Sequence, residues 1–144
     1  TEKKLIKIML DTRTMKGNQE LFGGAFPAAC LYAQPDLLKK TPGTAQALAT
    51  AIVRADQWLQ TATPAEVAAS VPEGYLLGDK SVYEKSFAGV RETISPDGLM
   101  PPGAMENSLK FLVEGDPKIA ADVGKIKLAD TWTNEFAQRA GKRS

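Results

Sequence analysis

The sequence has no histidine and only one cysteine, and both shortages restrict the chemistry open to the chain. Histidine is the commonest general base and metal ligand in proteins, so without it only carboxylates remain for these tasks. The acidic residues of the central region are not spaced to place two carboxylates on one helix face (Glu66, Glu73, Asp79 and Glu84). We therefore predict that the chain is not an enzyme and has no catalytic residue, no metal site and no cofactor.

Cys30 is the single cysteine, so no disulfide can form within the chain. It lies in the apolar run from Ala28 to Leu31, where we expect it to be a small buried side chain. A nucleophilic cysteine would need a nearby base, and there is no histidine to supply one. The cysteine count fits a reducing or an oxidising compartment equally well.

Charge of one sign and long apolar runs are also lacking. With 18 basic and 17 acidic residues the net charge is +1, which is not the basic balance typical of proteins that bind nucleic acid. No apolar run approaches the roughly 20 residues that a membrane span needs. The sequence given also shows no basic and then apolar segment with a small-residue cleavage site, the pattern of a secretory leader. We expect a soluble chain that does not bind nucleic acid.

Two segments are short and apolar enough to be strands. Lys4 to Leu10 is an almost continuous apolar run, and Ala28 to Ala33 is a second, shorter one. Polar, turn-forming residues follow the first run at Asp11 to Thr14 and at Lys16 to Asn18, so a loop is expected there. Two strands with no hairpin turn between them cannot make a self-sufficient sheet, which indicates a single incomplete unit over residues 1–144.

The chain from Pro35 onward has the pattern of helices separated by proline and glycine. The clearest helix begins at Thr41-Pro42 and ends near Thr61, because apolar residues recur there at three- and four-residue steps (Leu48, Ala51, Ile52, Ala55, Trp58 and Leu59). Further helices are predicted over 36–40, 64–71, 79–94, 101–113, 118–123 and from about 130 to 140. We expect their large apolar side chains to pack in a core (Trp58, Leu59, Phe87, Phe111, Trp132 and Phe136).

Several short motifs carry a family resemblance through their order along the chain. They are D-T-R-T (Asp11–Thr14), F-G-G-A-F-P (Phe22–Pro27), C-L-Y-A (Cys30–Ala33), T-P-A-E-V (Thr63–Val67), S-P-D-G-L-M (Ser95–Met100) and T-W-T-N-E-F (Thr131–Phe136). In this order they resemble the latter part of the periplasmic solute-binding proteins that serve ABC importers of nitrate, sulfonates or taurine. The resemblance spans nearly the whole chain.

The resemblance implies an α/β fold: the C-terminal portion of a two-lobed periplasmic binding protein (type II), rich in helices and with about two or three strands. Residues 1–30 would then be the end of the second lobe and the hinge crossing, and residues 31–144 the helical part that completes the first lobe. The implied partners are a small, anionic solute and, through the full-length protein, an ABC permease in the membrane. The implied location is the periplasm, or an extracellular lipid anchor, where the parent protein carries a secretory leader.

Six residues are candidates for contact with such a solute. Arg13 between Thr12 and Thr14 offers a cation and two hydroxyl groups, which suit nitrate, a sulfonate or a carboxylate. The structural alternative is that Asp11 and Arg13 pair with neighbouring loops for structural reasons. Gly23 and Gly24 could bring backbone N–H groups to a ligand or simply make a turn, and Phe26 with Tyr32 could line a cleft or belong to the core.

Two other functions stay open at this point. The chain could be a stand-alone helical interaction domain, given the helix-rich region after Thr41. It could also resemble the thiamine-precursor synthases of the same superfamily, although those enzymes use a histidine that this chain lacks. If the chain is only part of a fold, its unpaired strand edges would favour a homodimer.

Overall fold

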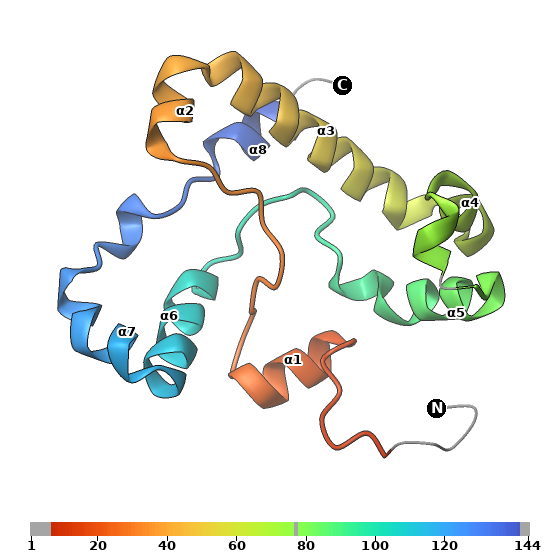
Figure 1. Ribbon diagram of the computed structural model, residues 1–144, viewed down its shortest axis with the longest axis horizontal. Coiled ribbons are helices and arrows are strands. Elements are labelled where there is room, and N and C mark those ends of the chain that lie inside the picture. The colour runs from red at the N-terminus through yellow and green to blue at the C-terminus, as the bar shows by residue number, and fades with distance from the viewer. Residues whose placement is uncertain (1–6, 77, 142–144) are drawn as a thin grey trace.

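The computed structural model describes residues 7–76 and 78–141, and the regular elements among these residues are all helices (Figure 1). The α-helices are α1 (Met15–Phe22), α2 (Pro35–Lys40), α3 (Pro42–Thr61), α4 (Pro64–Ser70), α5 (Lys80–Val90), α6 (Ala104–Gly115), α7 (Pro117–Asp122) and α8 (Glu135–Gly141). Short 3-10 helices are η1 (Glu73–Leu76), η2 (Arg91–Thr93), η3 (Val123–Lys125) and η4 (Leu128–Asp130). The predicted α/β architecture with two or three strands is therefore wrong, because the described residues contain no strand.

Neither predicted strand forms in the described part of the chain. Residues 1–6 of the first segment lie outside the described residues, and 7–10 are exposed and irregular. The second segment, 28–33, connects α1 to α2 as an exposed stretch, and no backbone hydrogen bond with another described residue involves it (Figure 1). A strand exists only when a neighbouring strand accepts and donates its backbone hydrogen bonds, and no described strand lies beside these segments.

Helix α1 occupies the region for which the polar sequence predicted a loop. Thr14 caps its N-terminus by accepting a hydrogen bond from the Gly17 N–H at 3.0 Å. Glu92, 77 residues away, accepts a second one from the Met15 N–H at 2.9 Å. Gly23 ends the helix in the left-handed conformation with φ of 75°, which glycine adopts without strain. Capping at both ends thus stabilises a short helix that has no buried residue.

The long helix α3 packs along α8, and this pair joins the middle of the chain to its C-terminal end (Figure 1). Pro42 at the first position of α3 suits a helix start, as predicted. Ala45 and Val53 are buried on α3, and Ala140 is buried on α8. The Gln46 amide donates to the carbonyl oxygen of Phe136 at 2.9 Å across the two helices.

A second packed region lies where α4 meets α5. The capping box predicted from the sequence is present, with the Thr63 hydroxyl and the Glu66 carboxylate each bonded to the other residue's backbone N–H. Ala62, Val67 and Phe87 form the buried cluster, which Leu59, Tyr83 and Ile94 surround. The Arg91 guanidinium donates to the carbonyls of Gln60 and Ala62 and covers the Phe87 ring, so it satisfies the C-terminal end of α3.

Three phenylalanines connect α1 to α6. Phe22 and Phe26 stack with ring centroids 4.0 Å apart, and Phe111 of α6 meets both rings edge-on at 5.1 and 5.3 Å. The Asn107 amide of α6 also donates to the Ala25 carbonyl at 3.2 Å. The turn after α1 is therefore attached to α6 by an aromatic cluster and a hydrogen bond.

Burial is sparse in the described chain. The buried apolar residues are mostly alanines, with Val53, Val67 and Phe87 the larger exceptions, and no large side chain is completely enclosed. Trp58 and Phe111, which the helical spacing predicted to be core, are 42% and 44% exposed. Among the described helices, none has both the length and the apolar character to cross a membrane.

Candidate functional site

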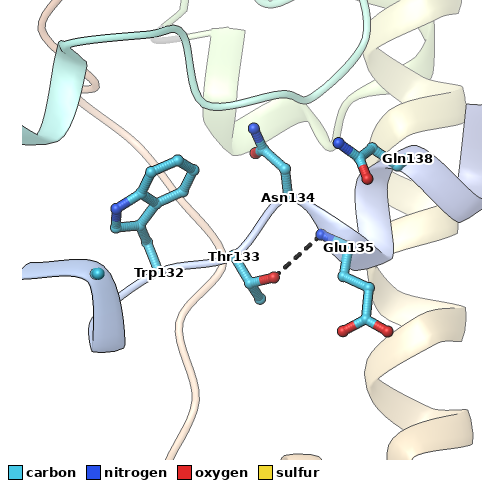
Figure 2. A pocket seen from close by; sticks show the side chains of 6 residues that line it. Trp132, Thr133, Asn134, Glu135 and Gln138 are labelled. Atoms are coloured by element: carbon cyan, nitrogen blue, oxygen red, sulfur yellow. Dashed lines mark hydrogen bonds between the residues drawn. The ribbon is translucent and has the colours of Figure 1, made fainter.

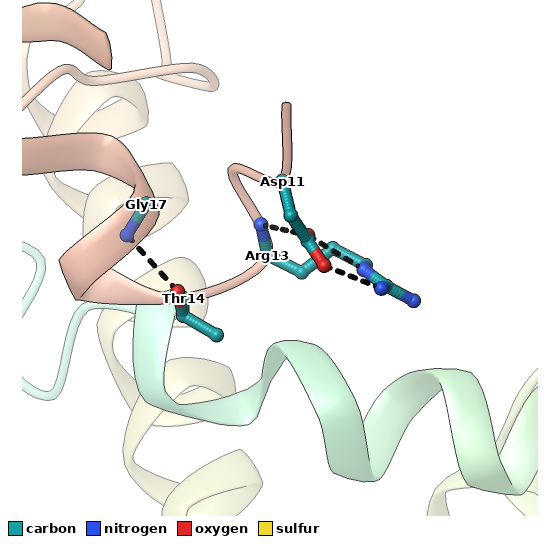
Figure 3. A network of polar contacts seen from close by, with 4 residues as sticks. All are labelled: Asp11, Arg13, Thr14 and Gly17. Carbon is teal, nitrogen blue, oxygen red and sulfur yellow. Dashed lines mark hydrogen bonds and ion pairs between the residues drawn. The ribbon is translucent and has the colours of Figure 1, made fainter. Parts of the chain in front are cut away.

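The loop before α1 is organised by an ion pair between Asp11 and Arg13 (Figure 3). The Arg13 Nε donates to Asp11 Oδ1 at 2.8 Å, Nη2 donates to Oδ2 at 2.5 Å, and the Arg13 backbone N–H donates to Oδ1 at 3.1 Å. One edge of the guanidinium is thereby occupied, and the other points away from α1. Because the Arg13 side chain is 57% exposed, that outer edge can reach a ligand.

The same bonds control the charge on Asp11. Hydrogen bonds from the Arg13 side chain and then from its backbone N–H lower the pKa of the Asp11 carboxyl from 3.8 to about 2. The lowered pKa means that the ion pair is complete above pH 3.8 and is lost as the pH falls through about 2. The Asp11 carboxylate is therefore ionised, and able to pair with Arg13, throughout the neutral range.

We expect the substitution Arg13→Gln to move the Asp11 pKa back towards 3.8, because both side-chain bonds disappear. An NMR titration of the Asp11 carboxyl carbon would measure the shift. The matched control is Lys40→Gln, which removes another exposed ion pair, with Asp36, and should leave the Asp11 titration unchanged. An unchanged Asp11 pKa in Arg13→Gln would contradict the pairing.

Thr12 and Thr14 flank Arg13, and both form hydrogen bonds within the chain that stabilise the start of α1. The carbonyl oxygen of Thr12 accepts a hydrogen bond from the Asn18 amide at 3.0 Å, and the Thr14 hydroxyl caps α1. Gly17 has no room for a side chain, since a Cβ there would collide with the Asp11 carbonyl oxygen. The backbone of Asp11 therefore packs directly on α1, and this close contact positions the Arg13 loop.

The other predicted residues lie at the far end of α1. Gly23 is the left-handed cap, the Gly24 backbone passes the Asn107 side chain, and Phe26 belongs to the aromatic cluster. Eight helical residues separate the two groups, which corresponds to roughly 12 Å along the axis. The six candidates thus form two groups, one at each end of α1, and neither of the two hollows described below is lined by both groups.

A hollow of about 390 Å³ lies beside the N-terminal half of α1. Apolar side chains and three charged ones line it (Ile8, Met9, Leu10, Asp11, Thr14, Lys16, Gly17, Glu20 and Leu21). Lys16 and Glu20 lie 3.7 Å apart across one helical turn, and with Asp11 the lining has one cation and two carboxylates, so its net charge is negative. The first-turn N–H groups of Met15 and Gly17 already have acceptors, and an anion cannot use them.

A second hollow, about 420 Å³ and widely open, lies at the start of α8 (Figure 2). Its lining is Ala129, Trp132, Thr133, Asn134, Glu135 and Gln138. The Thr133 hydroxyl accepts from the Glu135 N–H at 3.2 Å, and the Glu135 carboxylate pairs with Arg139 at 2.9 Å. Most of the polar groups that line this hollow therefore already have partners within the chain.

Cys30 is exposed, so the prediction of a small buried side chain is wrong. Its segment runs over the surface between helices instead of entering a core. Over the described residues, no group of three or more cysteine and acidic side chains is arranged to hold a metal ion. Tyr32, considered as a cleft residue, is 89% exposed.

The sequence analysis did not identify the polar side chains that bond loops to distant parts of the chain. Glu92, Asn107 and Asn134 each bond a backbone group 34 to 82 residues away. The only signal was indirect: Asn134 lies in the closing motif and Met100 in the S-P-D-G-L-M motif, and these two motifs prove to be in contact. A polar residue in a loop gives no local indication of its distant partner.

Comparison with solved structures yields an informative match. A structure from Bordetella bronchiseptica RB50 superposes with a TM-score of 0.90 and 46% sequence identity over 96% of this chain. This chain spans only 43% of the length of that protein, which is therefore more than twice as long. No protein-family model matches the sequence, and a search of curated proteins found no match.

Proposed function

We propose that this chain is a helical part of a longer solute-binding protein that serves an ABC importer, with nitrate, a sulfonate or a taurine-like anion as the solute. In this proposal the solute contacts the Arg13 loop and does not react, so the chain is not an enzyme. A membrane permease is the partner of the complete protein, and the periplasm is its location where a secretory leader is present.

The observation that carries the proposal is the geometry of Arg13. Asp11 holds the guanidinium by its Nε–Nη2 edge and leaves the Nη1 side exposed to solvent. A guanidinium fixed in this way loses little rotamer freedom on binding, and its free N–H groups suit the planar or tetrahedral oxygens of an oxyanion. The Asp11 charge reduces the net attraction, which favours a weakly held solute that can be released.

The match to a longer protein supports the proposal that the chain works as a part. Its backbone agrees with 43% of the Bordetella protein at a TM-score of 0.90, while its own core is small. The alternative of a stand-alone interaction domain fits the helical fold, but such a domain would bury more of its large apolar side chains than this chain does.

The test uses a hybrid in which this chain replaces the matched region of the Bordetella protein. Calorimetric titration of the hybrid with nitrate, taurine and a short alkyl sulfonate should give binding to at least one of them. Arg13→Gln should weaken that binding by about 10- to 100-fold, because charge-assisted hydrogen bonds contribute roughly 1.5–3 kcal/mol. Arg54→Gln, at an exposed position on α3, is the control and should bind as the unsubstituted hybrid does.

A folded hybrid that gives no heat with any of these anions would overturn the proposal. Binding that is equal in Arg13→Gln and the unsubstituted hybrid would remove Arg13 from the site. Arg13→Lys separates charge from geometry, since lysine keeps the cation but cannot hold Asp11 by two parallel bonds. Weakened binding in this variant would support an arrangement in which Asp11 holds one edge of the guanidinium and the solute contacts the other.

A further inference from the structure

Helix α3 has two apolar faces: one is packed against α8, and the other meets the cluster of Ala62, Val67 and Phe87 only through Leu59, near the C-terminal end of the helix. The packed face carries Ala45 and Val53, which are 5% and 2% exposed and lie against the α8 side. Gln46 on the same side bonds to the Phe136 carbonyl of α8. This face alone would make α3 an ordinary surface helix with one buried stripe.

The second face is a stripe of apolar residues that the described elements leave exposed. Leu48, Ile52 and Trp58 are 46%, 42% and 42% exposed, and Ala51 and Ala55 between them are exposed as well. At 3.6 residues per turn, these five positions fall within a sector of about 120°, and Arg54 and Asp56 fall outside it. We call this surface, made of Leu48, Ala51, Ile52, Ala55 and Trp58, the α3 stripe.

The composition of the α3 stripe suits burial better than contact with water. It contains no charged or hydrogen-bonding side chain apart from the Trp58 indole N–H. The two alanines have short side chains, which allow another element to approach α3 closely. A stripe about 120° wide is typical of a helix that faces the core of a globular protein.

We propose that the α3 stripe is an internal interface, covered in a longer polypeptide by the part that corresponds to the unmatched portion of the Bordetella protein. That portion is more than half of the Bordetella chain, and the backbone of this chain matches the remainder closely. The inference rests on the proposed function only in placing this chain within a longer protein, and it does not depend on any solute.

A second copy of this chain is the less favoured occupant because the α3 stripe is small. The α3 stripe consists of five residues, far fewer than the roughly 20–30 residues that each side of a stable interface contributes. A stable dimer buries about 800 Å² on each partner. The unmatched portion of the Bordetella protein is longer than the matched part and offers more surface for such an interface.

The experiment compares thiol accessibility in this chain and in the hybrid with the rest of the Bordetella protein. Ile52→Cys is made in a Cys30→Ser background, since Cys30 is itself exposed. In the isolated chain a maleimide should label position 52 readily, and in the hybrid labelling should be slower by on the order of tenfold or more. Gln57→Cys, exposed on the opposite side of α3, should label equally fast in both.

Each outcome decides the inference. Protection of position 52 but not of position 57 in the hybrid supports it, and Leu48→Cys should repeat the result if Ile52→Cys perturbs folding. Fast labelling of position 52 in the hybrid overturns it, and anion binding by that same hybrid would leave the proposed function standing. Slow labelling of position 52 in the isolated chain, together with a dimeric mass by light scattering, would show that a second copy covers the α3 stripe. That result would also overturn the inference.

Discussion

Replacing Gly98 with alanine is expected to destabilise the chain by about 2–4 kcal/mol, the largest effect we expect from a single added methyl group. Two causes add together at this position. Gly98 has φ of 70°, a left-handed conformation that costs an alanine roughly 1–2 kcal/mol. In addition, a Cβ there would lie only 2.7 Å from Cγ2 of Val53, which is 2% exposed and cannot move freely.

The loop around Gly98 explains why this contact cannot relax easily. The Ser95 hydroxyl accepts from the Gly98 N–H at 2.8 Å, and the Asp97 carboxylate accepts from the Leu99 N–H at 2.9 Å. These two bonds hold the turn that passes over α3. A methyl group on Gly98 must therefore displace Val53 or break the turn.

Gly103→Ala is the matched control, because it separates backbone strain from the steric clash. Gly103 has φ of 76°, but a Cβ at this residue would meet no other atom within 4 Å, so the variant should lose only about 1–2 kcal/mol. Urea denaturation followed by circular dichroism would measure both variants. Equal losses would mean that Gly98 does not approach Val53 closely, whereas Val53→Ala should recover part of the Gly98→Ala loss if it does.

Asn134→Leu is expected to cost about 2–3 kcal/mol, because leucine leaves the Met100 backbone without its partners. Asn134 Oδ1 accepts from the Met100 N–H at 2.8 Å, and Nδ2 donates to the Met100 carbonyl at 3.1 Å. Both bonds are partly buried, so water cannot replace them completely. The pair connects the segment before α6 to the start of α8 across 34 residues.

Hydrogen exchange provides a second readout of this contact. The Met100 amide should exchange markedly faster in Asn134→Leu, while amides in the cluster of Val67 and Phe87 should change only as far as global stability does. Gln138→Ala, at an exposed position of α8, is the control and should stay within about 0.5 kcal/mol of the original chain. An unchanged Met100 exchange rate in Asn134→Leu would show that the amide pair is not formed.

The helices from α2 onward were predictable because their signals are local. Pro42 and Pro64 mark the first helical position, Thr63 with Glu66 makes a capping box, and Asp79 and Asp116 cap the helices that follow them. All these interactions join residues within one turn, so the sequence contains both partners side by side. For the same reason the predicted helix boundaries agree with the structure to within a few residues at most ends.

The candidate site was only partly predictable. The sequence suggested that Asp11 and Arg13 could pair with neighbouring loops, whereas in the structure these two residues pair with each other. The sequence also suggested Gly23, Gly24 and Phe26 as members of the same site, but α1 keeps them at its other end. That helix was not predicted, since one of its N-terminal acceptors is Glu92, far along the chain.

Sequence alone determined where the helices from α2 onward lie, because i to i+4 hydrogen bonds and most caps depend on residues a few positions apart. Tertiary structure alone decided three other matters. Residues 28–33 find no strand partner among the described residues, and α8 covers one apolar face of α3. The side chains of Glu92 and Asn134 accept hydrogen bonds from the distant backbone N–H groups of Met15 and Met100. These outcomes depend on which surfaces meet in space. A strand or an apolar helix face has no fixed environment until its partner is present.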